Sequence, residues 1–332
     1  MNIDEILAGI PALSALVVGD VCLDRWCRYD PTLAEPSRET GIPRIAVTEV
    51  ECTPGGGGTV AANLRALGTG RIAVLGVLGD DGHAHELRRA LEQRGIDAAA
   101  LVTSADVQTF TYTKLINQLT SVEDLPRVDF VNARDLPEAV QSAVVERFRS
   151  LAMQFDVIIV SDQAELDRGG VVTAALRQAI TEFAEKHPQT IVWVDSRTRG
   201  EQFRGVLVKL NEEEARQACA KLGAGAGPEA LRRHIGYQTL LLTRGPAGCV
   251  VVTAEGENLV PARRIEKPVD ICGAGDAFNA GASLALRLTR DPITAARFGN
   301  LVASITIMKP GTGTASRGEV RRQAADADFL TA

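Results

Sequence analysis

The chain has 332 residues, of which 45% are hydrophobic and 23% are charged, so it can bury a large core. Its net charge of -6 includes no long run of one sign, which argues against a nucleic-acid groove or an anionic membrane as partner. The first residues lack the basic and apolar segments of a signal peptide, and the six cysteines form no C-x-x-C pair. We therefore expect a cytoplasmic protein with reduced thiols and a small-molecule ligand.

Short runs of Val, Ile and Leu recur along the chain and are typical of strands that are buried on both faces. They cover residues 15–19, 72–78, 156–160, 190–194, 206–210, 239–242 and 249–252. Helical patterns lie between several of these runs, at residues 60–67, 84–94, 137–152, 170–186, 212–221 and 228–235. This alternation predicts an α/β fold with an open parallel sheet and helices on both sides.

Two segments, residues 22–53 and 109–131, break this rhythm. They carry many charges and alternate polar with apolar residues, which predicts antiparallel strands with one solvated face. Because both segments follow early strands, we expect them to form a small β-sheet lid over the carboxyl ends of the main strands, where open α/β sheets bind ligands. No repeat or clear linker divides the sequence, so residues 1–332 are expected to form one domain.

The most informative segment runs from Val269 to Gly281 and is followed by an Ala- and Leu-rich helix that extends to about Leu288. Its Gly273-Ala274-Gly275 loop carries almost no side chains, so its backbone N–H groups can bind an anion at the helix N-terminus. Asp276 follows in the first helical turn, where a carboxylate can accept the proton of an attacking hydroxyl. An aspartate at this place can also simply cap the helix.

This segment resembles the second signature of the ribokinase-like (PfkB) carbohydrate kinases, in which Asp-Thr-Thr-Gly-Ala-Gly-Asp precedes a Phe and a Gly. Phe278 and Gly281 match that signature, whereas Ile271 and Cys272 replace its two threonines. Neither the Gly-x-Gly-x-x-Gly string of a Rossmann dehydrogenase after the first strand nor a P-loop string is present.

The resemblance implies a ribokinase-like three-layer α/β/α fold, doubly wound around a mainly parallel sheet, with a β-sheet lid. It also implies an ATP- and Mg²⁺-dependent carbohydrate kinase. In such an enzyme Asp276 would be the catalytic base, and the amides of Gly273, Ala274 and Gly275 would hold the charge that develops on the phosphoryl group.

Over nearly the whole chain, the sequence looks most similar to the heptose 7-phosphate kinases of ADP-heptose synthesis, which implies a sugar or sugar phosphate as acceptor. Residues 17–26 resemble the opening strand of that group, and residues 54–63 match the family's first signature, whose glycines let the backbone approach the sugar. The implied acceptor contacts are Asp20, Asp24, Gly55, Gly56, Gly57, Thr59, Asn63, Lys114 and Arg127. Asp20 fits a turn residue equally well, and the two cations also fit an exposed, solvated face.

Three departures from the heptose kinases leave the acceptor open. Thr59 stands where most relatives have an asparagine that contacts the sugar. Residues 195–197, Asp-Ser-Arg, replace Asp-Pro-Lys, and residues 163–165, Gln-Ala-Glu, replace a Tyr-Gly-Lys element. Both of these segments are expected at strand ends that face the site.

The resemblance further implies nucleotide contacts at Lys209, Asn211, Thr243, Gly245, Gly248, Asn300 and Gly311. Asn211 to Glu214 matches the family's Asn-x-x-Glu element, so Glu214 is expected to hold Mg²⁺ through water, although the same residues also suit a capped, acidic helix start. In many relatives a monovalent cation such as K⁺ lies beside the anion-binding loop, and its ligands here would be Asp270, Gly311 and Ser316.

Two other functions remain open: a nucleoside kinase of the same fold, and a catalytically weak protein that binds nucleotide or sugar. An arginine-rich lid favours an anionic sugar phosphate over a nucleoside. We also expect a homodimer that forms through the lid. Because no cytidylyltransferase-like segment follows residue 332 in this sequence, we expect kinase activity alone.

Overall fold

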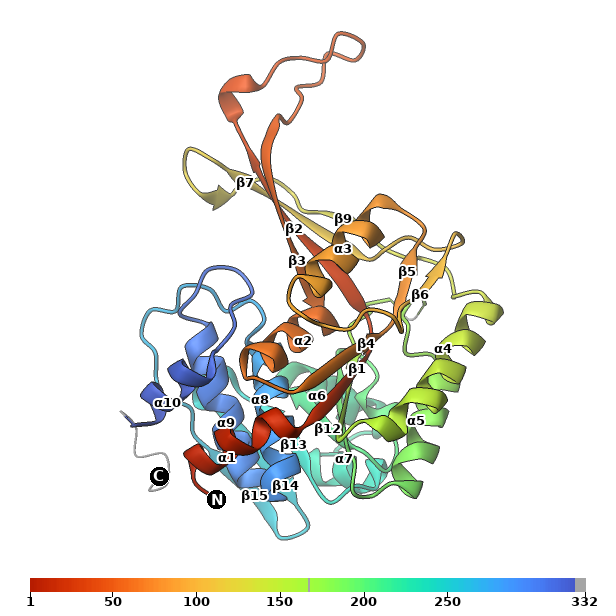
Figure 1. Ribbon diagram of the computed structural model, residues 1–332, viewed down its shortest axis with the longest axis vertical. Helices are drawn as coiled ribbons and strands as arrows, with labels where there is room; N and C mark the ends of the chain where they lie inside the picture. The colour runs from red at the N-terminus through yellow and green to blue at the C-terminus, as the bar shows by residue number, and fades with distance from the viewer. Residues whose placement is uncertain (167, 326–332) are drawn as a thin grey trace.

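The largest sheet of the computed structural model has eight strands within the described residues, 1–166 and 168–325, in the order β15-β14-β13-β12-β11-β10-β1-β4 (Figure 1). Neighbours from β4 to β13 run parallel, and β14 and β15 are antiparallel additions at one edge. The strands are β1 Ser14–Gly19, β4 Arg71–Leu75, β10 Val157–Asp162, β11 Ile191–Ser196, β12 Leu207–Asn211, β13 Leu240–Thr243, β14 Cys249–Thr253 and β15 Gly256–Val260.

Helices cover both faces of this sheet, because successive strand residues are apolar on both sides. On β1, Val17 packs into one hydrophobic cluster, whereas Leu16 and Val18 pack into the other. The first cluster involves α1 Ile3–Gly9, α2 Gly57–Ala66, α3 Gly82–Glu92, α8 Ala274–Thr289, α9 Pro292–Thr306 and α10 Arg317–Ala325. The second involves α4 Glu138–Leu151, α5 Ala174–Lys186, α6 Glu212–Leu222 and α7 Pro228–Ile235. The predicted three-layer α/β/α fold is confirmed.

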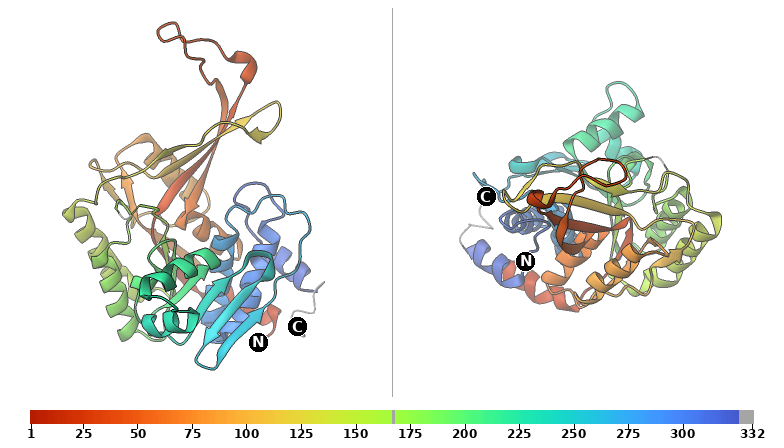
Figure 2. Two further views of the ribbon diagram at one scale, coloured as in Figure 1. Left: turned by 180° about the vertical axis from the view of Figure 1, so that it is seen from behind. Right: turned by 90° about the horizontal axis from the view of Figure 1, so that it is seen from above.

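A smaller sheet projects from the body and ends in the 30–46 loop (Figures 1 and 2). It joins the two segments that break the α/β rhythm, with strands β2 Val21–Tyr29, β3 Val47–Gly56, β7 Thr111–Asn117, β8 Val122–Glu123 and β9 Val128–Phe130. We call this sheet the lid. The predicted antiparallel pairing is found between β2 and β3 and between β7 and its neighbours β8 and β9. The prediction was wrong only for the pairing of β2 with β7, which is parallel because both strands leave the body in the same direction.

Three details differ from the sequence-based boundaries. The predicted strand 72–78 is divided at Gly76 into β4 and β5 Val77–Gly79, and residue 76 must be glycine because a Cβ there would lie 2.7 Å from the carbonyl oxygen of Gly19. β5 pairs with β6 Val102–Ser104 instead of continuing the main sheet. Helix α5 begins at Ala174 and not at residue 170, because the Thr173 side chain caps it. The glycines at 55–58, from the family's first signature, span the junction of a strand and a helix, because β3 runs to Gly56 and α2 begins at Gly57.

Five short 3-10 helices complete the described chain, at Ile10–Ala12, Pro31–Leu33, Ala152–Gln154, Gly200–Gln202 and Gly245–Ala247. Across residues 1–166 and 168–325, each helix is too short or too polar to cross a bilayer.

Candidate active site

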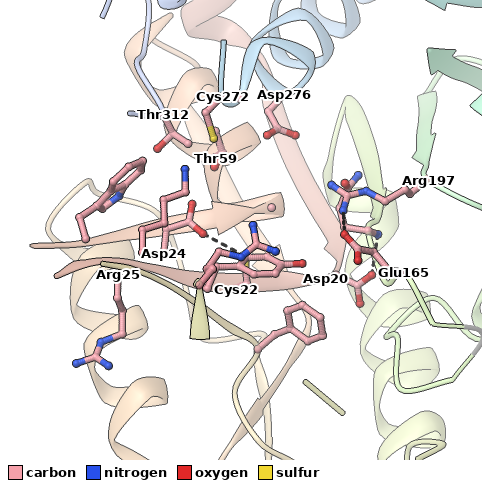
Figure 3. Close-up of a pocket in the computed structure, with 18 residues that line it drawn as sticks. Asp20, Cys22, Asp24, Arg25, Thr59, Glu165, Arg197, Cys272, Asp276 and Thr312 are labelled. Atoms are coloured by element: carbon pink, nitrogen blue, oxygen red, sulfur yellow. Dashed lines mark hydrogen bonds and ion pairs between the residues drawn. The ribbon is translucent and has the colours of Figure 1, made fainter. Parts of the chain in front are cut away.

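A cavity of about 200 Å³ lies where the lid meets the carboxyl ends of the main strands (Figure 3). It brings together residues from the lid, from α2, from the ends of β10 and β11, and from the start of α8. Its lining residues are Asp20, Cys22, Asp24, Arg25, Trp26, Gly56, Thr59, Phe110, Tyr112, Lys114, Arg127, Gln163, Glu165, Arg197, Cys272, Gly273, Asp276 and Thr312.

The N-terminus of α8 faces this cavity. Gly273 is the N-cap residue and adopts a φ of 76°, a left-handed conformation that suits glycine, and it has no side chain to cap the helix. The N–H groups of the first helical turn therefore lack a side-chain cap and can bind an anion. Ala274 and Gly275 belong to this first turn, so the predicted anion-binding segment is the start of the helix itself.

Asp276 lies in the same turn, and its side chain is partly buried in the cavity wall. Burial raises its pKa to about 8, and the nearby carboxylate of Asp195 adds to the rise, whereas Lys209 opposes it. A carboxyl group with such a pKa can accept a proton near neutral pH. Its place on the cavity wall makes it suited to the role of base and not only of helix cap.

Lys209 lies beside this turn, since a Cβ added at Gly275 would be 3.4 Å from its Nζ. Its ammonium group donates to Asp195 Oδ1 at 3.2 Å, and both side chains are buried. Asn279 Nδ2 in turn donates to Asp195 Oδ2 at 2.6 Å, and Trp193 Nε1 donates to Asn279 Oδ1. The site thus holds a fixed ammonium group, paired with a carboxylate, next to the N-terminus of α8.

Asp24 projects from β2 into the cavity opposite Asp276 (Figure 3). Gly55 lies across the strand pair, and a Cβ there would come within 2.5 Å of Asp24 Oδ1, so only glycine leaves room for this carboxylate. Burial raises the pKa of Asp24 to about 6, and Lys114 and Arg127 act against that rise. A partly buried carboxylate here can accept hydrogen bonds from two sugar hydroxyls.

Asp20 lies at the edge of the cavity, and its carboxylate is occupied by the backbone. It accepts hydrogen bonds of 2.8 Å from the N–H groups of Gln163, Ala164 and Val171. These contacts hold the loop after β10, in agreement with the alternative of a structural turn residue. Its predicted contact with the acceptor stays a prediction.

Two other predicted acceptor residues, Thr59 and Asn63, lie on α2. The Thr59 hydroxyl lines the cavity wall and donates to the Pro54 carbonyl at 3.1 Å. Asn63 is fully buried and donates to the Thr59 carbonyl, so it supports the helix from within and does not line the cavity. Gly57 is also buried behind Gly56, against Val17.

The two predicted lid cations reach the cavity, and each has an aromatic neighbour. The Lys114 ammonium lies 4.3 Å from the centre of the Trp26 ring, and the Arg127 guanidinium lies 4.7 Å from that of Tyr112. Arg127 also forms an ion pair with Asp129 at 2.8 Å. The lid therefore presents positive charge to the cavity on side chains that are already oriented.

The predicted nucleotide residues follow the ends of β12 and β13. Asn211 caps α6 by accepting from Glu214 N, while Glu214 Oε2 accepts from Asn211 N at 2.7 Å. Burial raises the pKa of Glu214, and the charge of Asp195 adds to the rise. The Thr243 hydroxyl donates to the Leu210 carbonyl, and the turn from Gly245 to Gly248 follows it. Asn300 lies farther away on α9, where its amide holds the Val260 carbonyl.

Asp270 joins two loops beside the N-terminus of α8. Its carboxylate accepts from Cys272 N at 2.9 Å and from Gly311 N at 3.1 Å. Two of the three predicted monovalent-cation ligands thus lie together. Ser316 is engaged elsewhere, because its backbone N–H and its hydroxyl both donate to Glu319.

Several cavity residues were not among the predicted site residues. Trp26, Phe110 and Tyr112 give the acceptor side an aromatic wall, and Glu165 forms an ion pair with Arg197 on the opposite side. The sequence did indicate the segments that carry this pair, because residues 163–165 and 195–197 were both expected at strand ends that face the site. The sequence did not indicate the aromatic residues, because a lid strand with one packed face is expected to contain aromatic side chains whether or not they line a binding site.

The sequence matches a family described as pfkB family carbohydrate kinase over residues 14–317. The bifunctional protein HldE of Caulobacter sp. (strain K31) is 32% identical over 328 residues, which cover 96% of this chain and 64% of that protein. The corresponding protein of Geobacter sulfurreducens is 27% identical, with 96% and 64% covered. The chain thus spans less than two thirds of the length of these two relatives.

Solved structures show the same fold. Ribokinase from Thermotoga maritima aligns with a TM-score of 0.68 and 19% identity, covering 94% of this chain and 99% of that chain. Ribokinase from Arabidopsis thaliana, solved with ribose and ATP, aligns with a TM-score of 0.68 and 16% identity, covering 94% and 98%. The fold, together with the family match over most of the sequence, shows that this chain belongs to the pfkB family of carbohydrate kinases.

Proposed function

We propose that the protein transfers the γ-phosphoryl group of ATP to a hydroxyl of a sugar phosphate, with heptose 7-phosphate as the first acceptor to test. The observation that carries this proposal is the placement of Asp276. It lies at an uncapped helix N-terminus, on the wall of a cavity that also contains Asp24 and the lid cations Lys114 and Arg127. A base, an anion site and an acceptor pocket therefore meet at one point.

In this reaction Asp276 accepts the proton of the acceptor hydroxyl as its oxygen bonds to the γ-phosphorus. The bond between that phosphorus and the bridging oxygen breaks, and ADP leaves. The first N–H groups of α8 and the ammonium of Lys209 stabilise the negative charge on the transferring group. Asp24 orients the acceptor through its hydroxyls, and the lid keeps water from the attacking position.

The residues present fit Mg²⁺ as a companion of the nucleotide. Among the described residues no cluster of three or more His, Cys, Asp or Glu side chains could hold a metal ion by itself. Mg²⁺ typically needs only one or two carboxylates together with substrate phosphates and water. Glu214 would hold the ion, because the negative charge of Asp195 raises the pKa of Glu214 and a cation would relieve that repulsion. Mg²⁺ would supply charge neutralisation at the phosphates.

A sugar phosphate is favoured by the charge of the lid. Lys114 and Arg127 lie on the acceptor side of the cavity, where a phosphate that stays on the sugar would find two cations. The relatives named bifunctional protein HldE support a heptose phosphate, and whether this protein has their second activity is outside the proposal.

A nucleoside acceptor is the second candidate, because the aromatic wall could hold a base. Phe110 and Tyr112 pack edge to face with ring centres 5.4 Å apart, and both line the cavity with Trp26. One structural neighbour is a Burkholderia thailandensis nucleoside kinase in complex with inosine, at 19% identity and a TM-score of 0.65. The acceptor panel must therefore include nucleosides.

The test is ADP release from Mg-ATP with hexoses, pentoses, hexose phosphates, heptose phosphates and nucleosides, with Asp276→Asn beside the wild type. We expect one class of acceptor to turn over and the variant to lose about 10²-fold or more. Turnover of nucleosides alone would replace the sugar-phosphate proposal. If ATP binds and no acceptor yields ADP, the protein is a binding protein and not a kinase.

Three further features belong to the proposal. A monovalent cation would be bound near Asp270 and Gly311, with Ser316 joining only if it releases Glu319. A homodimer would form through the lid, because exposed apolar side chains gather there and β3 is an edge strand. These side chains are Leu33, Ile42, Ile45, Val47, Val50, Leu119, Val122 and Val128. We also propose that the protein acts in the cytoplasm.

A further inference from the structure

Arg197 lies between the acceptor cavity and the nucleotide side of the site. It follows the last residue of β11, and Figure 3 shows its guanidinium directed into the cavity on the side of Asp276. Burial raises the pKa of Asp276 and of Glu214, and the positive charge of Arg197 acts against that rise at both carboxyl groups. One guanidinium thus influences the acceptor side and the metal side together.

The backbone at Arg197 is firmly held. Its N–H donates to the carbonyl of Asp162 at 3.0 Å, and the preceding Ser196 is buried and donates to the Asp162 carboxylate at 2.6 Å. Two residues later, Arg199 pairs with the same carboxylate in a buried ion pair. The base of the Arg197 side chain therefore has a fixed position at the strand end.

The tip of the side chain is held much less firmly. The guanidinium pairs with Glu165, and the two side chains are 42% and 61% exposed. An exposed ion pair of this kind contributes little, since water and salt compete with it. A phosphoryl group offers three charged oxygens to the planar fork of an arginine and could displace the single carboxylate.

The other cations near the reacting groups differ from Arg197 in how they are held. Lys209 is buried against Asp195, and Arg127 is paired with Asp129 on the lid. Lys114 lies over the Trp26 ring, on the acceptor side. Arg197 differs from them in three ways. Its backbone is held firmly, its ion pair with Glu165 is exposed and can be replaced, and it lies between the proposed sites of the two substrates.

From this arrangement, and resting on the proposed kinase activity, we propose that Arg197 is a further catalytic residue, which leaves Glu165 and binds the transferring phosphoryl group. In this step the acceptor proton moves to Asp276, the bond from acceptor oxygen to phosphorus forms, and the bond to the bridging oxygen of ADP breaks. Arg197 gains no proton and loses none. It stabilises charge on the equatorial oxygens of the phosphoryl group, together with the first N–H groups of α8.

The first test compares Arg197→Gln, Arg197→Lys and the matched control Arg149→Gln, using the acceptor found in the panel. Arg149 lies on α4, remote from the cavity, and has an exposed acidic partner in Glu182, as Arg197 has in Glu165. We expect Arg197→Gln to lower kcat about 10²- to 10³-fold, with KM for Mg-ATP changed less than about threefold. Arg197→Lys should recover part of the loss, because lysine keeps the charge without the fork. An increase in KM for the acceptor with kcat retained would overturn the proposal and assign Arg197 to acceptor binding.

The second test needs no acceptor. Mg-ADP is titrated into each protein with and without aluminium fluoride, which mimics the transferring phosphoryl group. We expect aluminium fluoride to tighten binding to the wild type at least about tenfold and to have little effect on Arg197→Gln. Glu165→Gln, which frees the guanidinium, should increase the gain by about 1.5- to 5-fold. No gain in the wild type, or an equal gain in Arg197→Gln, would overturn the proposal.

The two tests also separate this inference from the proposed function. If the wild type forms no ADP with any acceptor, the kinase proposal fails, and the aluminium fluoride titration still decides whether Arg197 holds a phosphoryl group. If ADP forms and Arg197→Gln remains fully active, the kinase proposal is supported and the proposed catalytic role of Arg197 is refuted.

Discussion

Lys209 and Asp195 form a buried ion pair, 3.2 Å long, next to the first turn of α8. Asn279, one turn after Asp276 on the same helix, donates to the other oxygen of that carboxylate. The pair therefore joins the ends of β11 and β12 to the helix that carries the proposed base.

Breaking this pair should destabilise the fold. Lys209→Met leaves the Asp195 carboxylate buried without its counter-charge, and we expect the free energy of unfolding to fall by about 3–5 kcal/mol. Urea unfolding followed by circular dichroism measures the change. Arg216→Met is the control, because its ion pair with Glu213 is exposed and its removal should leave the midpoint unchanged. Equal midpoints for Lys209→Met and the wild type would show that the pair is not needed for stability.

The rate should depend on pH through Asp276. Its pKa lies at about 8, and only the ionised form can accept a proton. We expect kcat/KM for the acceptor to rise with pH up to about 8 and then to level off. Asp276→Asn should lose this dependence along with its activity. A profile that stays flat between pH 6 and 9 in the wild type would argue against Asp276 as the base.

The same residue should make the fold less stable at higher pH. The folded state holds the Asp276 proton up to a pKa of about 8, whereas the unfolded chain loses it near the ordinary value of 3.8. The folded state therefore binds more protons between these values, and the contribution to stability falls as pH rises through them. Asp276→Asn has no carboxyl group to titrate and so avoids this loss. We therefore compare the melting temperature of the variant with that of the wild type at each pH. The difference, variant minus wild type, should be larger at pH 8.5 than at pH 5.5 by about 2 °C or more. An unchanged difference would contradict the raised pKa.

Gly55 should control acceptor affinity through Asp24. The added Cβ of Gly55→Ala would lie 2.5 Å from the carboxylate, so Asp24 must move away from its present position. We expect KM for the acceptor to increase about tenfold or more, because small displacements of a binding group are costly. Gly82→Ala, where a Cβ meets no atom within 4 Å, is the matched control. If the two variants have the same KM, Asp24 does not contact the acceptor.

The lid should carry the dimer contact. Val50 lies on the edge strand β3 with 44% of its surface exposed, and Ile42 at the tip is 68% exposed. We expect the double variant Val50→Glu, Ile42→Glu to sediment as a monomer where the wild type sediments as a dimer. Met153→Glu tests an equally exposed apolar residue away from the lid. A monomeric wild type would refute the dimer.

The sequence predicted the features that depend on local pattern. Buried strands, helix starts such as the Asn211 cap, and the uncapped start of α8 all follow from residue types at fixed spacing. Pairing direction does not, because side-chain alternation reports which face is buried and not which neighbour a strand has. This is why the parallel pairing of β2 with β7 was missed.

Contacts between distant segments were also beyond the sequence. Asp20 was predicted to contact the acceptor or to form a turn, and only the fold brings it to the N–H groups of residues 163, 164 and 171. Likewise, Glu165 and Arg197 were visible as departures from the heptose kinases, but their pairing depends on the adjacency of β10 and β11.

The parallel pairing of β2 and β7 limits how the lid can move. Both strands enter the lid from the body at the same end, and β3 and β9 return to the body there, since Gly56 pairs with Val21 and Phe130 pairs with Thr111. A rigid sheet that is attached along one end can swing only about the line through these attachment points. At about 3.3 Å per residue, a swing of about 10° would move the far end of β2 by about 5 Å and Asp24 by about 2 Å. A large displacement at the tip of the lid, where a second subunit would bind, would therefore move Asp24 by a smaller distance at the acceptor. Contact between subunits at the tip would in this way adjust the position of the acceptor-binding carboxylate.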